Sequence, residues 1–140
     1  MSFLALPAGR EKQGRQDFIA WVDEYLAGHP DQPYQYSGAD VYGARCAVLH
    51  AFSSEVDYHQ LNPKSRIYGY HDGGKHAFDP VVNQRLVMIG TASFLNDVVK
   101  AIESFMQACL MNADLRARVE GRLPKVLAIF PAPNKHQAAI

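Results

Sequence analysis

The sequence lacks a long apolar run and a leader of the secretory kind. No stretch approaches the ~20 consecutive apolar residues that a transmembrane helix needs, so we expect no membrane span. The opening segment, Met1 to Pro7, has no basic residues ahead of an apolar core, as a signal peptide would have. Together these absences predict a cytoplasmic protein.

An excess of charge of either sign is also missing. Fourteen Lys and Arg residues balance fourteen Asp and Glu residues, which gives a formal net charge of zero with histidine neutral. This balance argues against broad nonspecific nucleic-acid binding, which usually leaves a basic excess, and we expect no DNA partner. It still allows a local basic cleft in a symmetric dimer, and a near-zero charge offers little repulsion against self-association.

Cysteine is scarce, and several catalytic motifs are absent. Cys46 and Cys109 both fall in segments predicted to be buried helices, where two reduced thiols are expected rather than a disulfide. The sequence has no Gly-rich phosphate loop before a helix, no Gly-x-Ser-x-Gly elbow and no His-Glu-x-x-His motif. We therefore predict neither a cofactor nor a metal.

The patterns that are present predict a helical protein with a short β segment. A chain of 140 residues predicts one domain, 1–140. Apolar residues at helical spacing predict helices at 11–27, 37–52, 91–110 and 113–121, with Ser37 and Asn112 as N-caps. The helix at 91–110 has the longest apolar stripe, and Asp97, Lys100 and Glu103 are expected on its opposite, solvent-facing side.

Two segments, 66–71 and 84–89, predict strands that pair as a hairpin. Between them, residues 75–83 are expected to form a long connection or to contain a short third strand. Alternatively, Asp79 and Pro80 could begin a helix as its N-cap and first residue. Residues 1–9 and 131–140 are expected to be loose tails.

Residues 41–52 form the segment on which the functional interpretation depends. The segment is apolar or small except at Arg45 and His50. Arg45 lies one turn from Val41 and Val48 on an apolar stripe, so we expect it to be buried. A buried guanidinium needs a partner or a polar pocket. One interpretation is a core Arg bonded to a carboxylate and a core His bonded to a carbonyl.

The spacing Arg45-x4-His50 on an apolar helix resembles the signature of the HEPN superfamily, whose local pattern is Arg-polar-x3-His-x-Tyr. Here the run reads Arg-Cys-Ala-Val-Leu-His-Ala-Phe. The Arg, the His and the aromatic residue two positions later match. Cys46 replaces the polar residue that follows the Arg, and Phe52 replaces the hydroxyl-bearing Tyr.

This resemblance implies a fold, an activity and partners. The fold is an all-α or α-dominated four-helix bundle, here with a β-hairpin inserted between the second and third helices. The activity is that of a metal-independent endoribonuclease of a defence or toxin–antitoxin system, with RNA as substrate and an antitoxin protein as a possible partner. His50 would act as general base on a ribose 2′-hydroxyl, and Arg45 would stabilise charge on the scissile phosphate. The site would be shared between the subunits of a homodimer.

Cys46, Phe52 and the neutral charge favour a different interpretation. In it the protein is a non-catalytic HEPN-like binding or scaffold protein, and Arg45 holds the core or the dimer together through a carboxylate.

Two further groups of residues were candidate sites. His71 and His76 flank a turn and invite zinc, but a structural zinc site needs four ligands, so a solvated hairpin tip is preferred. Several tyrosines lie near Lys64 and Arg66 in sequence, where they would either stack on bases or pack on the helices, and we favour packing. These tyrosines are Tyr34, Tyr36, Tyr58, Tyr68 and Tyr70.

Overall fold

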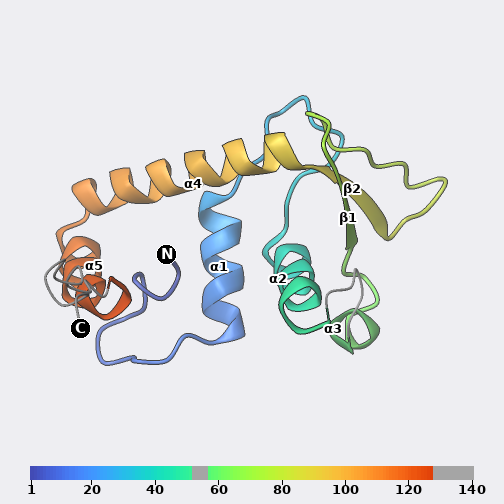
Figure 1. Cartoon of the computed structure of the whole chain (residues 1–140). Helices are drawn as coiled ribbons and strands as arrows, with labels where there is room; N and C mark the ends of the chain where they lie inside the picture. The colour runs from blue at the N-terminus through green and yellow to red at the C-terminus, as the bar shows by residue number, and fades with distance from the viewer. Residues whose placement is uncertain (52–56, 128–140) are drawn as a thin grey trace, which may run out of the picture.

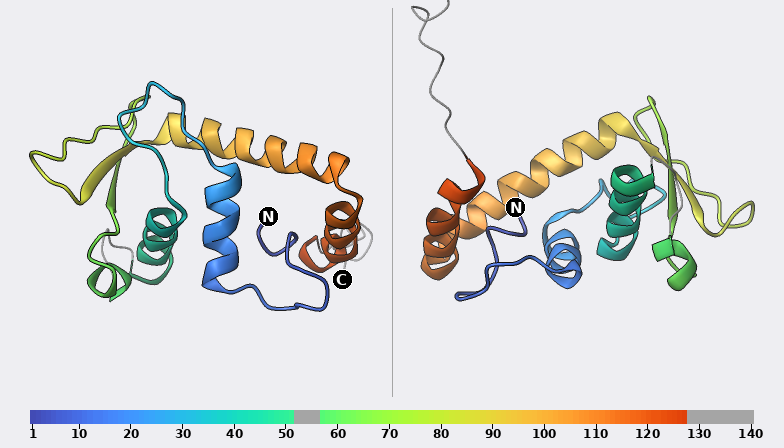
Figure 2. Two further views of the ribbon diagram at one scale, coloured as in Figure 1. Left: turned by 180° about the vertical axis from the view of Figure 1, so that it is seen from behind. Right: turned by 60° about the horizontal axis from the view of Figure 1, so that its bottom comes forward.

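The computed structural model describes residues 1–51 and 57–127, and its order of elements is shown in Figure 1. The elements are α1 (Arg15–Tyr25), α2 (Gly38–Cys46), the π-helix η1 (Ala47–Ala51), α3 (Asp57–Leu61), β1 (Ile67–His71), β2 (Leu86–Gly90), α4 (Thr91–Met111) and α5 (Ala113–Val126). The long helix α4 runs along one side of the molecule, with α1 and α2 beneath it. The sheet lies beyond α2, and α5 lies with the N-terminal arm at the other end (Figures 1 and 2).

The predicted four-helix bundle with an inserted hairpin is wrong. The described part of the chain contains five α-helices and one π-helix, and α2 packs on α1 on one side and on β1 on the other. The sheet therefore contributes residues to the core and is not an insertion outside a helical bundle. Helix α5 extends to Val126 and includes Pro124, beyond the end predicted from sequence.

The two strands run parallel, not antiparallel as a hairpin requires. Their register pairs Ile67 with Leu86 and His71 with Gly90. Parallel neighbours need a crossover connection of about a dozen residues or more, and residues 72–85 supply it. On its way back this connection makes one antiparallel bridge, between Ala77 and Met88. The carboxyl end of β2 leads directly into α4, so the sheet fixes where the long helix begins.

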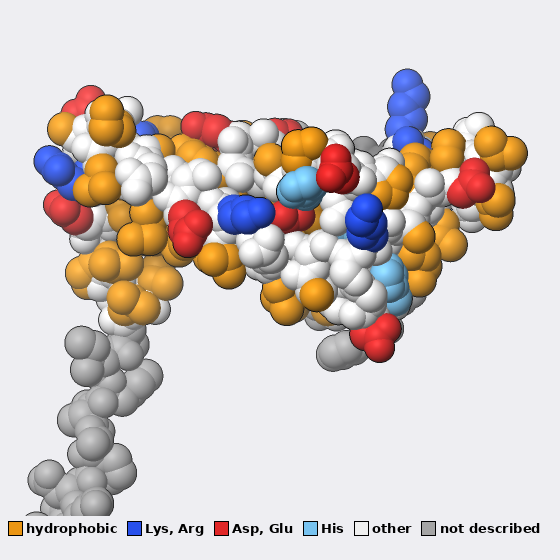
Figure 3. Space-filling view, turned by 90° about the horizontal axis from the view of Figure 1, so that it is seen from above, with side chains coloured by type: hydrophobic (Ala, Val, Ile, Leu, Met, Phe, Trp, Pro, Cys, Tyr) orange, Lys and Arg blue, Asp and Glu red, His pale blue; other side chains and the backbone are white. Residues whose placement is uncertain are grey.

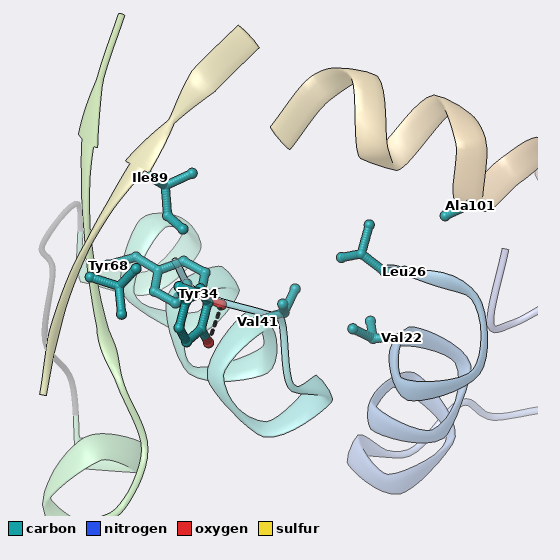
Figure 4. Packing of buried hydrophobic residues seen from close by; sticks show 9 residues of the cluster. Val22, Leu26, Tyr34, Val41, Tyr68, Ile89 and Ala101 are labelled. Carbon is teal, nitrogen blue, oxygen red and sulfur yellow. Dashed lines mark hydrogen bonds between the residues drawn. The ribbon is translucent and has the colours of Figure 1, made fainter. Parts of the chain in front are cut away.

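The main core lies between α1, α2, the sheet and the first half of α4. Val87 and Ile89 of β2 are completely buried and belong to one cluster with residues of α1, α2 and α4, part of which is drawn in Figure 4. The members of this cluster are Val22, Leu26, Tyr34, Val41, Ala44, Tyr68, Val87, Ile89 and Ala101. Burial of apolar area of this kind is the largest favourable term in folding.

A second core joins the N-terminal arm to α4 and α5, so residues 1–9 are not the loose tail that was predicted. Leu4 packs in a cluster with Phe105 and Leu115, and Leu6 is 2% exposed. The rings of Trp21 and Tyr25 pack edge-on against Phe105, with centroids 5.9 and 5.3 Å away. The other predicted tail, 131–140, lies outside the described residues.

Two helix starts confirm the predicted N-caps. The Ser37 hydroxyl accepts a hydrogen bond from the Asp40 N–H at 3.2 Å, and the Asn112 side chain accepts one from the Leu115 N–H at 3.0 Å. Each cap satisfies a main-chain donor that has no partner within its helix.

The side of α4 that faces away from α1 is open. Leu95, Val99, Met106 and Leu110 are all more than half exposed there. Seen from above, hydrophobic side chains are interspersed with charged ones (Figure 3). No helix in residues 1–51 or 57–127 is both long and apolar enough to cross a membrane.

Candidate functional site

Arg45 is exposed, so the prediction that it is buried is wrong. Helix α2 buries Val41 and Ala44, and Ala47 continues the same side into the π-helix. Val48 and Leu49 are 45% and 55% exposed, so the part of the apolar stripe that follows Arg45 does not face the core. The guanidinium carbon instead lies 5.6 Å from the centre of the Phe18 ring, within the range of a cation–π contact.

Arg45 borders a small polar cavity between the start of α1 and α2. The cavity has a volume of about 160 Å³ and is lined by Gln13, Gly14, Arg15, Phe18, Tyr42 and Arg45. Arg15 is also exposed, and no ion pair or hydrogen bond joins either guanidinium to another of the described residues. Two positive charges without a carboxylate partner therefore border one cavity. The expected carboxylate partner of Arg45 is not found in the described part of the chain.

The Tyr42 hydroxyl lies within electrostatic reach of both arginines. A hydrogen bond to Cys46 and partial burial raise the pKa of Tyr42, and the charges of Arg15 and Arg45 oppose that rise. The Tyr42 ring packs edge-on against Phe18 at 5.9 Å and Tyr58 at 5.2 Å. The cavity thus combines guanidinium groups, a hydroxyl and aromatic surface, which suits an anion attached to a planar group.

The amino end of α1 also faces this cavity. Gly14 is the N-cap, and its N–H donates to the Asp17 carboxylate at 2.7 Å. Asp17 accepts two further bonds from Arg10, at 2.8 and 2.7 Å, and these bonds to Gly14 and Arg10 lower its pKa despite an opposing desolvation effect. Because the Asp17 carboxylate binds Arg10 and Gly14, it does not form an ion pair with Arg15.

His50 lies in the π-helix Ala47–Ala51, which begins two residues after Arg45. Residues five apart in an α-helix are separated by roughly 140° around the axis. A turn closed by i→i+5 hydrogen bonds brings such positions more nearly above one another. The main chain between Arg45 and His50 therefore departs from α-helical geometry, and this departure reduces the angle between the two positions around the helix axis. The His50 side chain and Phe52 lie outside the described part of the structure.

His71 and His76 do not form a metal site with other residues. Among the described residues no group of three or more His, Cys, Asp or Glu side chains is placed to hold a metal ion. The Nδ1 atoms of both rings accept main-chain hydrogen bonds, from Gly73 at 3.0 Å and Gly90 at 3.1 Å. His76 is 3% exposed, so it is not at a solvated hairpin tip either.

His76 belongs to a buried polar chain that sequence reasoning missed. Because the Gly90 N–H donates to Nδ1, the neutral ring carries its proton on Nε2 and donates to the Tyr36 hydroxyl at 2.6 Å. Tyr36 in turn donates to Asp97 at 3.0 Å. Asp97 is 2% exposed, although it was predicted to face solvent. All three side chains have defined donor and acceptor roles.

A second buried chain runs beside the first. Tyr34 donates to Asp40 at 2.6 Å, so the 2.9 Å contact between Tyr34 and Tyr68 must have Tyr68 as donor. The other Asp40 oxygen accepts from the Arg66 N–H at 2.6 Å. Burial raises the pKa of both tyrosines, and the Asp40 carboxylate adds to the rise. Tyr34 and Tyr68 therefore pack in the core, as predicted. The alternation Tyr34-x-Tyr36 was the only sequence sign of the two chains.

The two cysteines are free thiols, as expected. Burial raises the pKa of Cys109, which makes its thiolate less available as a nucleophile. Comparison of the chain with models of protein families, with curated proteins and with solved structures gave no match.

Proposed function

We propose that the protein binds RNA by holding a phosphate group in the cavity between α1 and α2. The observation that carries this proposal is the pair Arg15 and Arg45, which are both exposed, border one polar cavity and have no acidic partner in residues 1–51 and 57–127. Guanidinium groups bind phosphate oxygens through paired, charge-assisted hydrogen bonds. A carboxylate that neutralised either arginine would weaken that binding, and neither has one among the described residues.

The aromatic residues beside the cavity support a nucleic acid over an isolated phosphate. Phe18, Tyr42 and Tyr58 form a connected set of rings next to the arginines. Bases of single-stranded RNA stack on such rings with little regard to sequence. RNA, rather than DNA, follows from the resemblance of the Arg45–His50 spacing to HEPN proteins. The role of Arg45 as a core or dimer clamp through a carboxylate has no support in the described residues.

The test measures binding of a labelled single-stranded RNA pool by fluorescence anisotropy across a salt series. We expect Arg15→Gln and Arg45→Gln each to weaken binding about tenfold at low salt and to reduce the salt slope by about one. Arg116→Gln, an exposed arginine on α5, is the matched control and should bind as the wild type does. Equal affinity of the wild type and the Arg15→Gln, Arg45→Gln double variant would refute the proposal.

A second candidate, endoribonuclease activity, is favoured by the π-helix between Arg45 and His50. In that function His50 takes the proton from a 2′-hydroxyl, and Arg45 stabilises the charge that develops on the phosphate. We expect the wild type to release 2′,3′-cyclic phosphate ends in EDTA. His50→Ala should still bind RNA but no longer cleave it. Binding without cleavage by the wild type would leave the RNA-binding function and remove the nuclease.

A homodimer and an antitoxin partner stay predictions. Both were inferred from the resemblance, in which two subunits share one site. Light scattering coupled to size exclusion measures the first directly. A monomer at micromolar concentration would contradict the shared site without contradicting phosphate binding by one chain.

A further inference from the structure

A larger cavity lies on a different side of α1, toward α4 and α5, and shares no lining residue with the cavity between α1 and α2. Its volume is about 340 Å³, within the lower range of cavities that bind small molecules. It is bordered by the N-terminal arm, α1, the last turn of α4 and α5, which enclose this end of the molecule in both views of Figure 2. The residues that carry its chemistry are Trp21, Glu24, Tyr25 and Arg118.

The arm that forms one wall of this cavity is held firmly. The Arg122 guanidinium donates to the main-chain carbonyls of Leu4, Leu6, Pro7 and Arg10, at 3.1, 2.5, 2.7 and 3.1 Å. Leu4 and Leu6 are buried beneath these bonds. The Ser2 hydroxyl also accepts from the Gln13 side chain at 2.6 Å. The wall is thus formed before a ligand arrives, which lowers the entropic cost of binding.

The cavity presents two opposite charges that do not neutralise one another. Its third charged residue, Asp17, is already paired with Arg10. Glu24 and Arg118 both line the cavity, yet no ion pair joins them to each other or to another described residue. The cavity therefore offers one negative group, which attracts a cation, and one positive group, which attracts an anion.

Two residues of the lining carry hydrogen-bond donors without a partner. The Nε atom of Arg118 and the indole nitrogen Nε1 of Trp21 are buried and have no acceptor among residues 1–51 and 57–127. Buried donors in native proteins are nearly always paired, with protein, water or ligand. Burial and the neighbouring Glu24 carboxylate raise the pKa of Tyr25 to about 12, so its hydroxyl stays neutral beside Glu24.

The same cavity also has apolar surface. The ring centroids of Trp21 and Tyr25 lie 5.4 Å apart, and Leu6 and Leu115 are also among the lining residues. A ligand that fits must be small, must carry one positive and one negative group, and must have an apolar part.

We propose that this cavity binds a free α-amino acid with an apolar side chain. Its carboxylate lies against Arg118 and the Trp21 indole N–H, and its ammonium group lies against Glu24. Its side chain packs on the rings of Trp21 and Tyr25. The proposal is independent of RNA binding, since it uses none of the residues at the Arg15–Arg45 cavity.

Isothermal titration and thermal shift test the proposal with leucine, methionine, phenylalanine and tryptophan. We expect at least one to bind with a Kd below about 1 mM and to raise the melting temperature at about 10 mM. The N-acetyl derivative lacks the positive charge, and the amide lacks the negative charge, so each should bind at least about tenfold more weakly.

Charge-removing variants locate the site. Arg118→Gln should weaken the amino acid about tenfold while leaving the weak binding of its amide unchanged. Glu24→Gln should weaken the amino acid while leaving its N-acetyl derivative unchanged. Because Glu24 is exposed, Glu24→Gln should fold normally, and it can test the site even if Arg118→Gln does not fold. Arg116→Gln is the control on α5 and should bind normally.

Two results would overturn the proposal. The first is that the folded wild type shows neither heat nor a shift in melting temperature with any of the four amino acids. The second is that an amino acid binds equally well to the wild type, Arg118→Gln and Glu24→Gln, which would place the ligand elsewhere.

Discussion

At the scale of single residues, the hydrogen bonds around His76 determine which nitrogen of its neutral ring carries the proton. Its Nδ1 accepts from Gly90, its Nε2 faces Tyr36, and its main-chain N–H donates to the Gln32 side chain at 2.8 Å. A proton on Nδ1 would remove the Gly90 bond. Burial lowers the pKa of His76, the charge of Asp97 partly opposes this effect, and His71 adds to the lowering.

This lowered pKa predicts a loss of stability in mild acid. The unfolded chain takes up a proton at the ordinary pKa of 6.5, whereas folded His76 resists it. The free energy of unfolding should therefore be unaffected by His76 above pH ~6.5 and should fall as the pH drops from there toward the lowered pKa. Urea unfolding between pH ~8 and ~5 measures this dependence.

Two variants assign the effect to His76. His76→Gln should flatten the pH dependence, and His29→Gln, at an exposed histidine, should leave it as in the wild type. The interpretation fails if His76→Gln and the wild type show the same slope.

At the scale of elements, the close approach of α1 and α2 depends on glycine. A Cβ atom at Gly38 would overlap the main-chain carbonyl of Ile19. The Gly38 N–H also donates to the Asp23 carboxylate at 2.5 Å, so the start of α2 is tied to α1. The position of α2, and with it the distance between Arg15 and Arg45, is fixed at this contact.

Gly38→Ala should therefore destabilise the protein by about 1–3 kcal/mol, the usual cost of overpacking. Gly121→Ala on α5 is the matched control, because nothing lies within 4 Å of its added Cβ. There the loss of glycine from a helix should stabilise by about 0.5–1 kcal/mol. Chemical denaturation gives both values, and a neutral Gly38→Ala would contradict the close approach.

At the scale of the whole molecule, Arg122 joins the two ends of the described chain. It bonds four carbonyls of the N-terminal arm from a position in α5. The second core, with Leu4 packed against Phe105 and Leu115, and the ion pair between Lys125 and Glu11 are the other contacts at this end. Arg122 is therefore the residue through which α5 is hydrogen-bonded to the main chain of the arm.

Arg122→Gln should lower the free energy of unfolding by about 2–3 kcal/mol, since it removes charge-assisted bonds to carbonyls that are partly buried. Arg116→Gln on the same helix should change it by less than about 0.5 kcal/mol. Hydrogen exchange should also show faster exchange in the arm of Arg122→Gln. An unchanged arm would mean that Leu4 and Leu6 hold it alone.

The sequence by itself determined the features that depend on neighbours within a turn or two. The helix over Thr91–Met111 and the caps Ser37 and Asn112 follow from local spacing and local hydrogen bonds, and the structure confirms them. Helical periodicity does not state which of two apolar sides of a helix faces the core. It therefore placed Asp97 in solvent, whereas the structure buries it.

Only the tertiary structure decided the direction of the strands, the exposure of Arg45 and the attachment of the arm. Each depends on contacts between residues far apart in sequence: β1 with β2, Arg45 with Phe18, and Arg122 with Leu4. A parallel pair and a hairpin have the same strand pattern, and an apolar stripe is the same whether or not another element covers it. The energy that separates these alternatives arises only when the elements pack, because burial is a property of the assembled core.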